Sequence, residues 1–274
     1  MPELPEVETI KRSLNSKLKD VKIEKCEVFY VGSLKSHSAE KFINEVTGEK
    51  IVEVDRRGKY LKIILENERI ILVHLRMTGR LLLTAADDHI TKHTHVIFYL
   101  NNGLHLRFID IRKFGTLNLA SKGELNNIRG YAILGPEPFG EDFTLEGFKE
   151  TVIRRKKAIK DLLLSQEVVA GIGNIYADEI LYSAGISPLR PANSLNDEEL
   201  ERLFHSIRVE LEKGIANRGT SFKDYVDADG ISGNNQDFLN VYQKAGCSCN
   251  NCGCKVVKSK IGGRSSHYCT GCQK

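Results

Sequence analysis

Six of the seven cysteines lie in the stretch CSCNNCGCKVVKSKIGGRSSHYCTGC near the C-terminus. Two C-x2-C pairs stand out within it, with sixteen residues between them: Cys249 with Cys252, and Cys269 with Cys272. Each pair places two thiolates on one side of a tight turn, and the intervening hairpin returns the second pair to complete a tetrahedron. The spacing predicts a four-cysteine zinc ribbon with one structural ion, because four protein ligands leave no open position for catalysis.

The remaining cysteines do not share this spacing. Cys247 and Cys254 could compete as ligands, but the Cys249–Cys252 pair has the x2 spacing with Gly253 directly after the turn. Disulfides are the weaker alternative, because the N-terminus lacks a basic stretch followed by an apolar one and we therefore expect a cytosolic chain. Cys26 stands alone, and we expect a small buried apolar side chain there.

A second group of chemically useful residues lies at the N-terminus, in MPELPEVE. If Met1 is removed, Pro2 presents a secondary amine that can form a Schiff base with a carbonyl carbon. With an α-amino pKa of about 7.8 against about 10.4 for lysine, the neutral fraction near pH 7 is roughly 300-fold larger. Glu3 is adjacent and can move protons. The open alternative is a capped helix start in which proline is a spacer.

The distribution of charge along the chain indicates what kind of partner the protein binds. The 274-residue chain has a net charge of +4, but its last 34 residues carry six basic and no acidic side chains, which leaves −2 for the rest. A basic tail on a near-neutral body indicates a polyanionic partner, although a solvated tail has the same charge. No apolar run approaches about 18 residues, so we expect no membrane span and a cytoplasmic location.

The elements that must position these residues follow from periodicity. Residues 5–18 predict a helix with proline in its first turn, and residues 22–120 predict antiparallel strands that form a sandwich, including a hairpin turned at Asn102-Gly103. The turn-rich segment 134–143 marks a boundary, beyond which the pattern becomes helical. Residues 217–238 form a long polar loop, which is usually functional or disordered.

Six motifs occur in order along the whole chain: PELPEVE, RRGKY, HLRMTG, DIRKFG, VVAGIGNIYADE and the four-cysteine tail. In this combination the sequence closely resembles bacterial formamidopyrimidine-DNA glycosylases. The resemblance implies a monomeric, bifunctional repair enzyme that binds double-stranded DNA, excises oxidised purines such as 8-oxoguanine through a Schiff base from Pro2, and cleaves the abasic strand by β,δ-elimination.

The resemblance also implies roles for individual residues. The catalytic set is Pro2, Glu3, Lys59 and Arg264, with Lys59 near the lesion phosphate and Arg264 at the tip of the zinc hairpin. Three residues, which we call the wedge residues, fill the space left by the flipped nucleotide: Met77, Arg112 and Phe114. The other DNA-binding positions that it implies are Glu6, His74, His93, Arg155, Lys160 and Asn174.

In isolation, most of these residues have a structural alternative. A lysine such as Lys59 can be an edge-strand residue, His74 a satisfied core histidine, and Met77 and Phe114 sandwich core. Glycines beside the two apolar wedge residues, at strand ends, favour projecting loops instead. Gly171, Gly173 and Asn174 predict a helix start whose backbone amides can approach phosphate.

The expected fold is α+β and multidomain. It comprises an N-terminal β-sandwich catalytic domain over 1–133, a helix–two-turn–helix domain over 134–238 with a lesion-recognition loop at 217–238, and a zinc finger over 239–274. Two rival functions remain open at this level: an endonuclease VIII-type glycosylase for oxidised pyrimidines, and a non-catalytic zinc-ribbon DNA-binding protein. PELPEVE and the long loop favour the oxidised-purine enzyme.

Overall fold

The computed structural model describes residues 2–274, and they form two compact units. One unit comprises the chain up to Ala132 together with Asn217–Asn234, and the other comprises Ile133–Ala216 together with Asn235–Lys274. Most of the predicted lesion-recognition loop therefore packs with the N-terminal unit, whereas we had grouped it with the helical segment. The three predicted domains, as functional divisions, remain a prediction.

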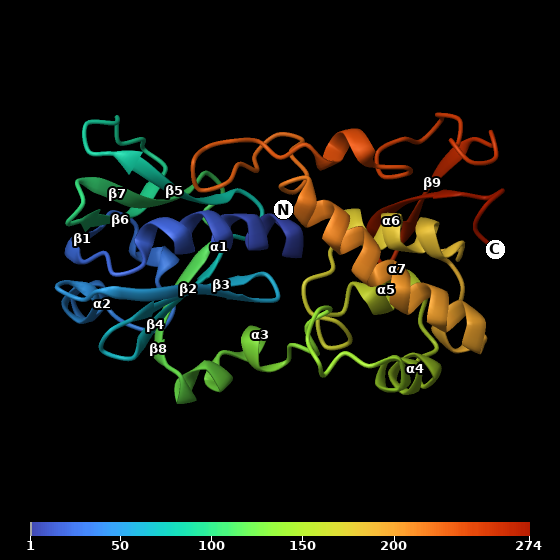
Figure 1. Cartoon of the computed structure of the whole chain (residues 1–274), viewed down its shortest axis with the longest axis horizontal. Helices are drawn as coiled ribbons and strands as arrows, with labels where there is room; N and C mark the ends of the chain where they lie inside the picture. The colour runs from blue at the N-terminus through green and yellow to red at the C-terminus, as the bar shows by residue number, and fades with distance from the viewer. Residues whose placement is uncertain (1) are drawn as a thin grey trace. The chain divides into compact units, whose positions relative to one another are not determined.

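The first helix begins where the terminal prolines and glutamates predict. Helix α1 spans Leu4–Leu18 (Figure 1) and has proline in its first turn. Glu3 is its N-cap, and Glu3 and Glu6 form a reciprocal capping box that satisfies two backbone N–H groups. Its apolar face, which includes Val7, Ile10 and Leu14, is buried in the core. The predicted amphipathic helix is confirmed.

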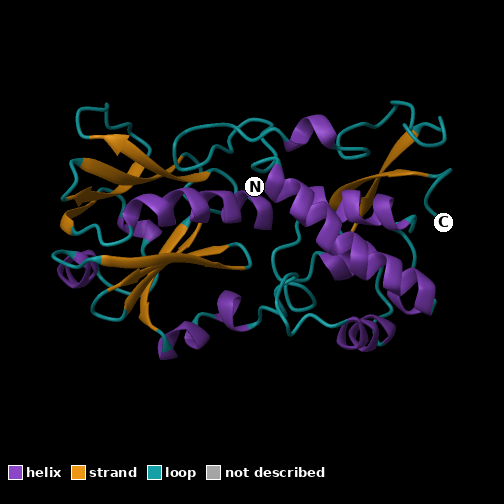
Figure 2. Ribbon diagram, in the orientation of Figure 1, coloured by secondary structure: helices purple, strands orange, loops and turns teal. Residues whose placement is uncertain are grey.

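Two four-stranded antiparallel sheets make up most of the N-terminal unit, and Figure 2 shows them as separate groups of strands. Their inner faces share one hydrophobic core with α1 and α2 (Ala39–Val46), so the predicted sandwich is confirmed. The first sheet has the order β1-β6-β7-β5, with β1 Ile23–Val28, β6 Thr94–Leu100, β7 Leu104–Asp110 and β5 Gly79–Ala85. The second has the order β2-β3-β4-β8, with β2 Ile51–Arg57, β3 Tyr60–Leu65, β4 Arg69–His74 and β8 Thr116–Ser121.

The predicted hairpins appear in register. β6 and β7 are joined through Asn102 and Gly103, and Gly103 has a φ of +80°, which glycine adopts at little cost. β3 and β4 pair from Tyr60↔His74 to Ile64↔Ile70 around the polar turn. Two short helical segments, η1 (Val31–Ser33) and η2 (Gly123–Asn127), and helix α3 (Arg129–Ala132) complete the unit outside the 217–234 loop.

The C-terminal unit consists of four α-helices followed by a two-stranded ribbon. Its helices are α4 (Leu145–Ile153), α5 (Ile159–Leu163), α6 (Asn174–Ala184) and α7 (Asp197–Ala216), with the short segments η3 (Ala192–Ser194) and η4 (Asn235–Phe238). Asn196 and Glu199 exchange hydrogen bonds of 2.9 Å at the start of α7, in the reciprocal pattern of a capping box. β9 (Val256–Ile261) and β10 (Arg264–Cys269) then form the hairpin between the two cysteine pairs.

Among residues 2–274, no helix combines the length and apolarity needed to cross a membrane.

Candidate catalytic site and metal centre

Pro2 and Glu3 are buried at the start of α1, where the capping box fixes the backbone. The Glu3 amide donates to Glu6 Oε2 at 2.8 Å. Glu6 Oε1 accepts a 2.7 Å hydrogen bond from the amide of Thr220, which lies in the 217–234 loop. A side chain on Gly219 would meet Glu6 Cγ at 2.8 Å, so only glycine permits this approach. The terminus is thereby tied to the predicted lesion-recognition loop.

Lys59 and His74 lie near each other on the second sheet. Lys59 follows Gly58 in the turn between β2 and β3 and is 7% exposed, while His74 ends β4 opposite Tyr60. Burial lowers the pKa of His74 to about 3, and the positive charges of Arg76 and Lys59 act in the same direction. The Arg76 amide donates to His74 Nδ1 at 3.1 Å. His74 is therefore neutral, with its proton on Nε2, and can act toward a phosphate as a hydrogen-bond donor.

The three wedge residues stand together in solvent rather than in the core. Met77 is 44% exposed and Phe114 is 54% exposed. Arg112 joins them: its Nη1 contacts Met77 Sδ at 3.0 Å, and its guanidinium lies 4.9 Å from the centre of the Phe114 ring. Two loops, one before β5 and one after β7, thus present a single exposed cluster of apolar surface and one planar cation.

His93 lies directly before β6 and is partly buried. Its backbone oxygen accepts a 3.0 Å hydrogen bond from the amide of Asp110, which places it beside the loop that carries Arg112.

In the C-terminal unit, three predicted DNA-binding residues lie on loops and element ends. Arg264 is exposed at the first position of β10, after the Gly262-Gly263 turn, as predicted for the hairpin tip. Asn174 begins α6 after Gly173, and its amide donates to the Ser265 carbonyl at 3.1 Å. Arg155 is exposed in the segment between α4 and α5, outside both helices.

Lys160 differs from the other predicted DNA contacts because its side chain has no solvent exposure. Its ammonium pairs with Asp178 Oδ1 at 2.7 Å and donates to the Ser265 carbonyl at 2.8 Å. Asp178 Oδ2 in turn accepts from the amide and Nδ1 of His267, at 2.9 and 3.1 Å. Because this ammonium is buried and engaged, the geometry favours an indirect role: Lys160 positions β10, next to Arg264, rather than contacting a phosphate.

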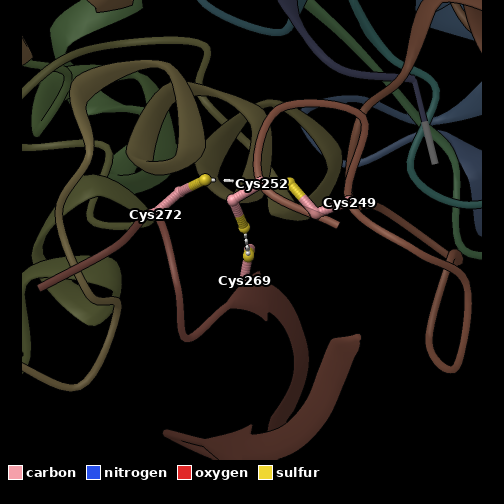
Figure 3. Close-up of side chains that lie close together, drawn as sticks. All are labelled: Cys249, Cys252, Cys269 and Cys272. Carbon is pink, nitrogen blue, oxygen red and sulfur yellow. Dashed lines mark hydrogen bonds between the residues drawn. The ribbon is translucent and has the colours of Figure 1, made fainter. Parts of the chain in front are cut away.

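The four predicted cysteines lie together as a candidate metal centre (Figure 3), with all their sulfur atoms within 4.8 Å of one another. The Sγ atoms of Cys252 and Cys269 are 3.3 Å apart, and those of Cys249 and Cys272 are 3.7 Å apart. A disulfide would require about 2.05 Å, whereas a tetrahedron with metal–sulfur bonds of about 2.3 Å has edges of about 3.8 Å. The donor set and spacing fit zinc, and the predicted ligand cluster is confirmed.

The thiols of this cluster do not behave alike: the pKa of Cys249 is lowered, whereas burial and hydrogen bonds with the neighbouring thiols raise the pKa of Cys269 and of Cys272. Burial opposes ionisation of Cys249, but hydrogen bonds from the Tyr182 hydroxyl and the local backbone lower its pKa to about 6. Cys247 and Cys254 are exposed and lie outside the cluster. Cys26 is buried as expected, and burial raises its pKa to about 12, which makes it unreactive.

Several supporting residues escaped the sequence analysis. Asp110 lies at the end of β7 and is completely buried beneath the wedge loops, although DIRKFG was noted only for its arginine and phenylalanine. Glu179 accepts from the amides of Asn240, Val241 and Tyr242 at 2.7–2.9 Å, which fixes the chain just before the ribbon. The sequence offered a signal only in the acidic residues themselves, because Thr78 lies 32 positions from Asp110 and the amides that Glu179 accepts from lie 61 to 63 positions away.

Comparisons with known proteins address the family. The family model "Formamidopyrimidine-DNA glycosylase N-terminal domain" matches residues 1–117, and the "Formamidopyrimidine-DNA glycosylase H2TH domain" matches residues 134–225. A formamidopyrimidine-DNA glycosylase of Pelotomaculum thermopropionicum is 48% identical over 274 residues, covering 100% of this chain and 99% of that protein. The chain belongs to the formamidopyrimidine-DNA glycosylase family. A Moorella thermoacetica relative of the same name is 49% identical over 253 residues, covering 92% of each chain.

Solved structures of this family have the same fold. A mutant of Lactococcus lactis FPG in complex with Fapy-dG containing DNA matches with a TM-score of 0.94 at 37% identity, over 100% of both chains. The Lactococcus lactis Fpg in complex with DNA that contains an abasic site matches with a TM-score of 0.93 at 37% identity, over 99% of both chains. The similarity spans both compact units, so it covers every predicted site residue.

Proposed function

We propose that this glycosylase-family chain removes oxidised purines from double-stranded DNA in base-excision repair and then cleaves the abasic strand, with Pro2 as the nucleophile. The observation that carries the proposal is the capping box at Glu3 and Glu6, which holds the residue before the helix in a defined place. Family membership, and relatives crystallised with lesion-containing and abasic DNA, support the substrate class.

The proposed reaction begins at the secondary amine of Pro2 after removal of Met1, which lies outside the described residues. The nitrogen bonds to the sugar C1′ while the bond from C1′ to the base breaks, and the base leaves with that electron pair and a proton. Opening of the sugar ring leaves an iminium, with Glu3 in place to supply the proton to the ring oxygen. Glu3 is the residue next to Pro2 and the N-cap of α1, so the amine and its carboxylate partner lie at adjacent backbone positions.

Strand cleavage follows from the same intermediate. The iminium makes the C2′ hydrogen acidic, so its loss expels the 3′ phosphate by β-elimination and a further proton loss expels the 5′ phosphate by δ-elimination. Lys59 would hold the phosphate near the lesion, and Arg264 would hold phosphates at the flipped nucleotide. Neutral His74 would donate to a phosphate oxygen. The wedge residues would fill the gap in the stack, which offsets an unstacking cost of a few kcal/mol.

The metal has a separate role in this proposal. Cys249, Cys252, Cys269 and Cys272 would hold one zinc ion, which would supply structure and no chemistry because all four positions are taken by thiolates. The ion would fix the ends of the β9–β10 hairpin that carries Arg264.

Borohydride trapping on an 8-oxoguanine duplex tests the proposal. Reduction of the iminium should give a stable protein–DNA adduct, and peptide mapping should place it at Pro2. Pro2→Gly should retain binding to an abasic-site duplex while its base excision is much slower. Pro5→Ala is the matched control, since it alters the same helix start without changing the amine. An adduct mapped to Lys59 or Lys160 would overturn the assignment.

A further inference from the structure

Asp110 connects the two loops that carry the wedge residues. Its carboxylate has no solvent exposure. One oxygen, Oδ1, accepts from the Thr78 hydroxyl and, at 3.1 Å, from the Arg112 amide, while Oδ2 accepts from the Gly115 amide at 2.7 Å. The Thr78 hydroxyl also accepts from the Arg112 amide at 3.2 Å. One buried side chain therefore joins Thr78, the residue after Met77, to Arg112 and to Gly115, the residue after Phe114.

The loops that Asp110 joins are conformationally strained. Arg76 has a φ of +56° and Lys113 a φ of +60°, in the left-handed region that residues other than glycine seldom adopt. Each precedes an apolar wedge residue by one position. Such strain persists only where surrounding contacts hold it, and it concentrates at functional sites. The carboxylate of Asp110 is buried and contacts both loops.

The loops around Asp110 are packed so closely that two of their positions require glycine. A side chain on Gly115 would meet Phe108 Cζ at 2.5 Å and Asp110 Oδ2 at 3.1 Å, so the Gly115 amide reaches the carboxylate only because it lacks Cβ. A side chain on Gly79 would meet the Leu75 carbonyl at 2.3 Å, which closes the first loop equally tightly.

We propose that Asp110 is a positioning residue that preorganises Met77, Arg112 and Phe114 as one rigid unit, so that they enter the base stack together. The inference rests on the proposed function and adds to it a residue that positions the wedge. Preorganisation matters most where a paired base must be unstacked, because a loose wedge loses part of its binding energy to ordering itself. It should matter little where the lesion is already unpaired.

Asp110→Asn is the sharpest variant, because it keeps the shape but converts one oxygen to an NH2 group. Whichever way the amide turns, a donor then faces the Gly115 amide or the Thr78–Arg112 pair. Thr78→Val removes a single hydroxyl from the same cluster. Thr84→Val is the matched control: it lies further along β5, where its hydroxyl makes only a 3.4 Å bond to the His105 carbonyl.

Single-turnover base excision should be measured on 8-oxoguanine paired with cytosine and on the same lesion within an unpaired bubble. We expect Asp110→Asn to lose about 10- to 100-fold on the paired substrate, the range for a hydrogen bond to a charged group, but less than about threefold on the bubble. Phe114→Ala should show the same asymmetry, Thr78→Val a smaller one, and Thr84→Val none. Equal losses on both substrates, or unchanged rates, would overturn the inference.

Two further measurements keep the result decisive. If Asp110→Asn fails to fold, as judged by thermal unfolding, Thr78→Val decides: symmetric loss contradicts the proposal and asymmetric loss supports it. If the wild-type protein excises neither substrate, the proposed function is wrong. The role of Asp110 is then tested by DNA binding alone. The fluorescence of 2-aminopurine placed beside an abasic analogue should rise when the wild-type protein binds the DNA. It should rise less when Asp110→Asn binds. An equal rise with both proteins would contradict the inference.

Discussion

Two buried aspartates support the exposed functional residues of the two units by different means. In the N-terminal unit, Asp110 accepts hydrogen bonds from the Thr78 hydroxyl and from the backbone amides of Arg112 and Gly115. In the C-terminal unit, Asp178 pairs with the buried ammonium of Lys160 and bonds His267. The donors to Asp110 are a hydroxyl and backbone amides, all of them neutral. Asp178 instead forms an ion pair with a lysine ammonium.

The difference follows from what each aspartate must join. Asp110 closes two short loops at the ends of neighbouring strands of one sheet, where backbone amides already point inward. Asp178 must join α6 to a two-stranded ribbon whose buried apolar cluster is small. Since the apolar cluster of the ribbon is small, a metal ion held by the four cysteines would supply much of its stability.

The largest effect should come from the metal. Zinc removal, or Cys249→Ser or Cys272→Ser, should unfold residues 245–274 and abolish DNA binding while the sandwich persists, because structural zinc contributes on the order of 10–16 kcal/mol to small metal domains. Hydrogen exchange of peptides from β9, β10 and the two sheets, with a gel-shift assay, would measure both outcomes.

Cys247 and Cys254, which lie outside the four-cysteine cluster, provide the controls for this result. Cys247→Ser and Cys254→Ser should keep the metal, the protection of the ribbon and DNA binding. A zinc stoichiometry of about one in Cys249→Ser would contradict the ligand assignment.

A smaller effect should follow from breaking the buried ion pair. Lys160→Met leaves the carboxylate of Asp178 buried without its cation, which should destabilise the ribbon by about 3–5 kcal/mol. The double variant Lys160→Met/Asp178→Leu should recover part of this loss, because both charges are then gone. Hydrogen exchange of the β10 peptide measures the local free energy of opening.

Lys149→Met is the matched control, since Lys149 pairs with Asp197 at 3.5 Å and that carboxylate is 86% exposed. An exposed pair contributes at most about 1 kcal/mol. Equal destabilisation by Lys160→Met and Lys149→Met would remove the contrast between the units.

The smallest effect concerns His74, the neutral buried group near the wedge loops. Its folded pKa of about 3 lies below the ordinary value of 6.5. As the pH falls below about 6.5, the unfolded chain binds a proton that the folded chain does not, so stability is lost progressively down to the folded pKa. This group should cost about 2 kcal/mol between pH 7 and pH 5.

His74→Asn tests this, because the asparagine oxygen can replace Nδ1 as acceptor for the Arg76 amide and does not titrate. Urea unfolding at several pH values should show a shallower pH dependence for His74→Asn than for wild type, by about that amount. Identical slopes would mean that His74 becomes protonated without penalty in the folded protein.

Much of the fold could be predicted because its signals are local. Proline and glutamates predict the start of α1, Asn102-Gly103 predicts the β6–β7 turn, and alternating apolar residues predict the strands of the sandwich. The cysteine spacing alone predicted the ligand cluster, since two C-x2-C turns joined by a hairpin allow few other arrangements.

The supporting contacts could not be predicted, because they join segments far apart in sequence. Nothing in the order of residues indicates that Glu6 meets the Thr220 amide, or that Lys160 is buried against Asp178 instead of exposed in a basic run. Basic residues are usually solvated, and burial of an ammonium depends on the partner that packing brings to it.

By itself, the sequence determined the family, the element types and which residue types are available for chemistry, because these depend on neighbours within a few positions. Only the tertiary structure decided which of those residues are exposed and which are positioned by buried side chains. It placed Met77 and Phe114 in solvent although their type favours the core, and it buried Asp110 although its type favours the surface. The physical reason is that exposure depends on the sum of long-range packing and hydrogen bonding, and no short stretch of sequence contains that sum.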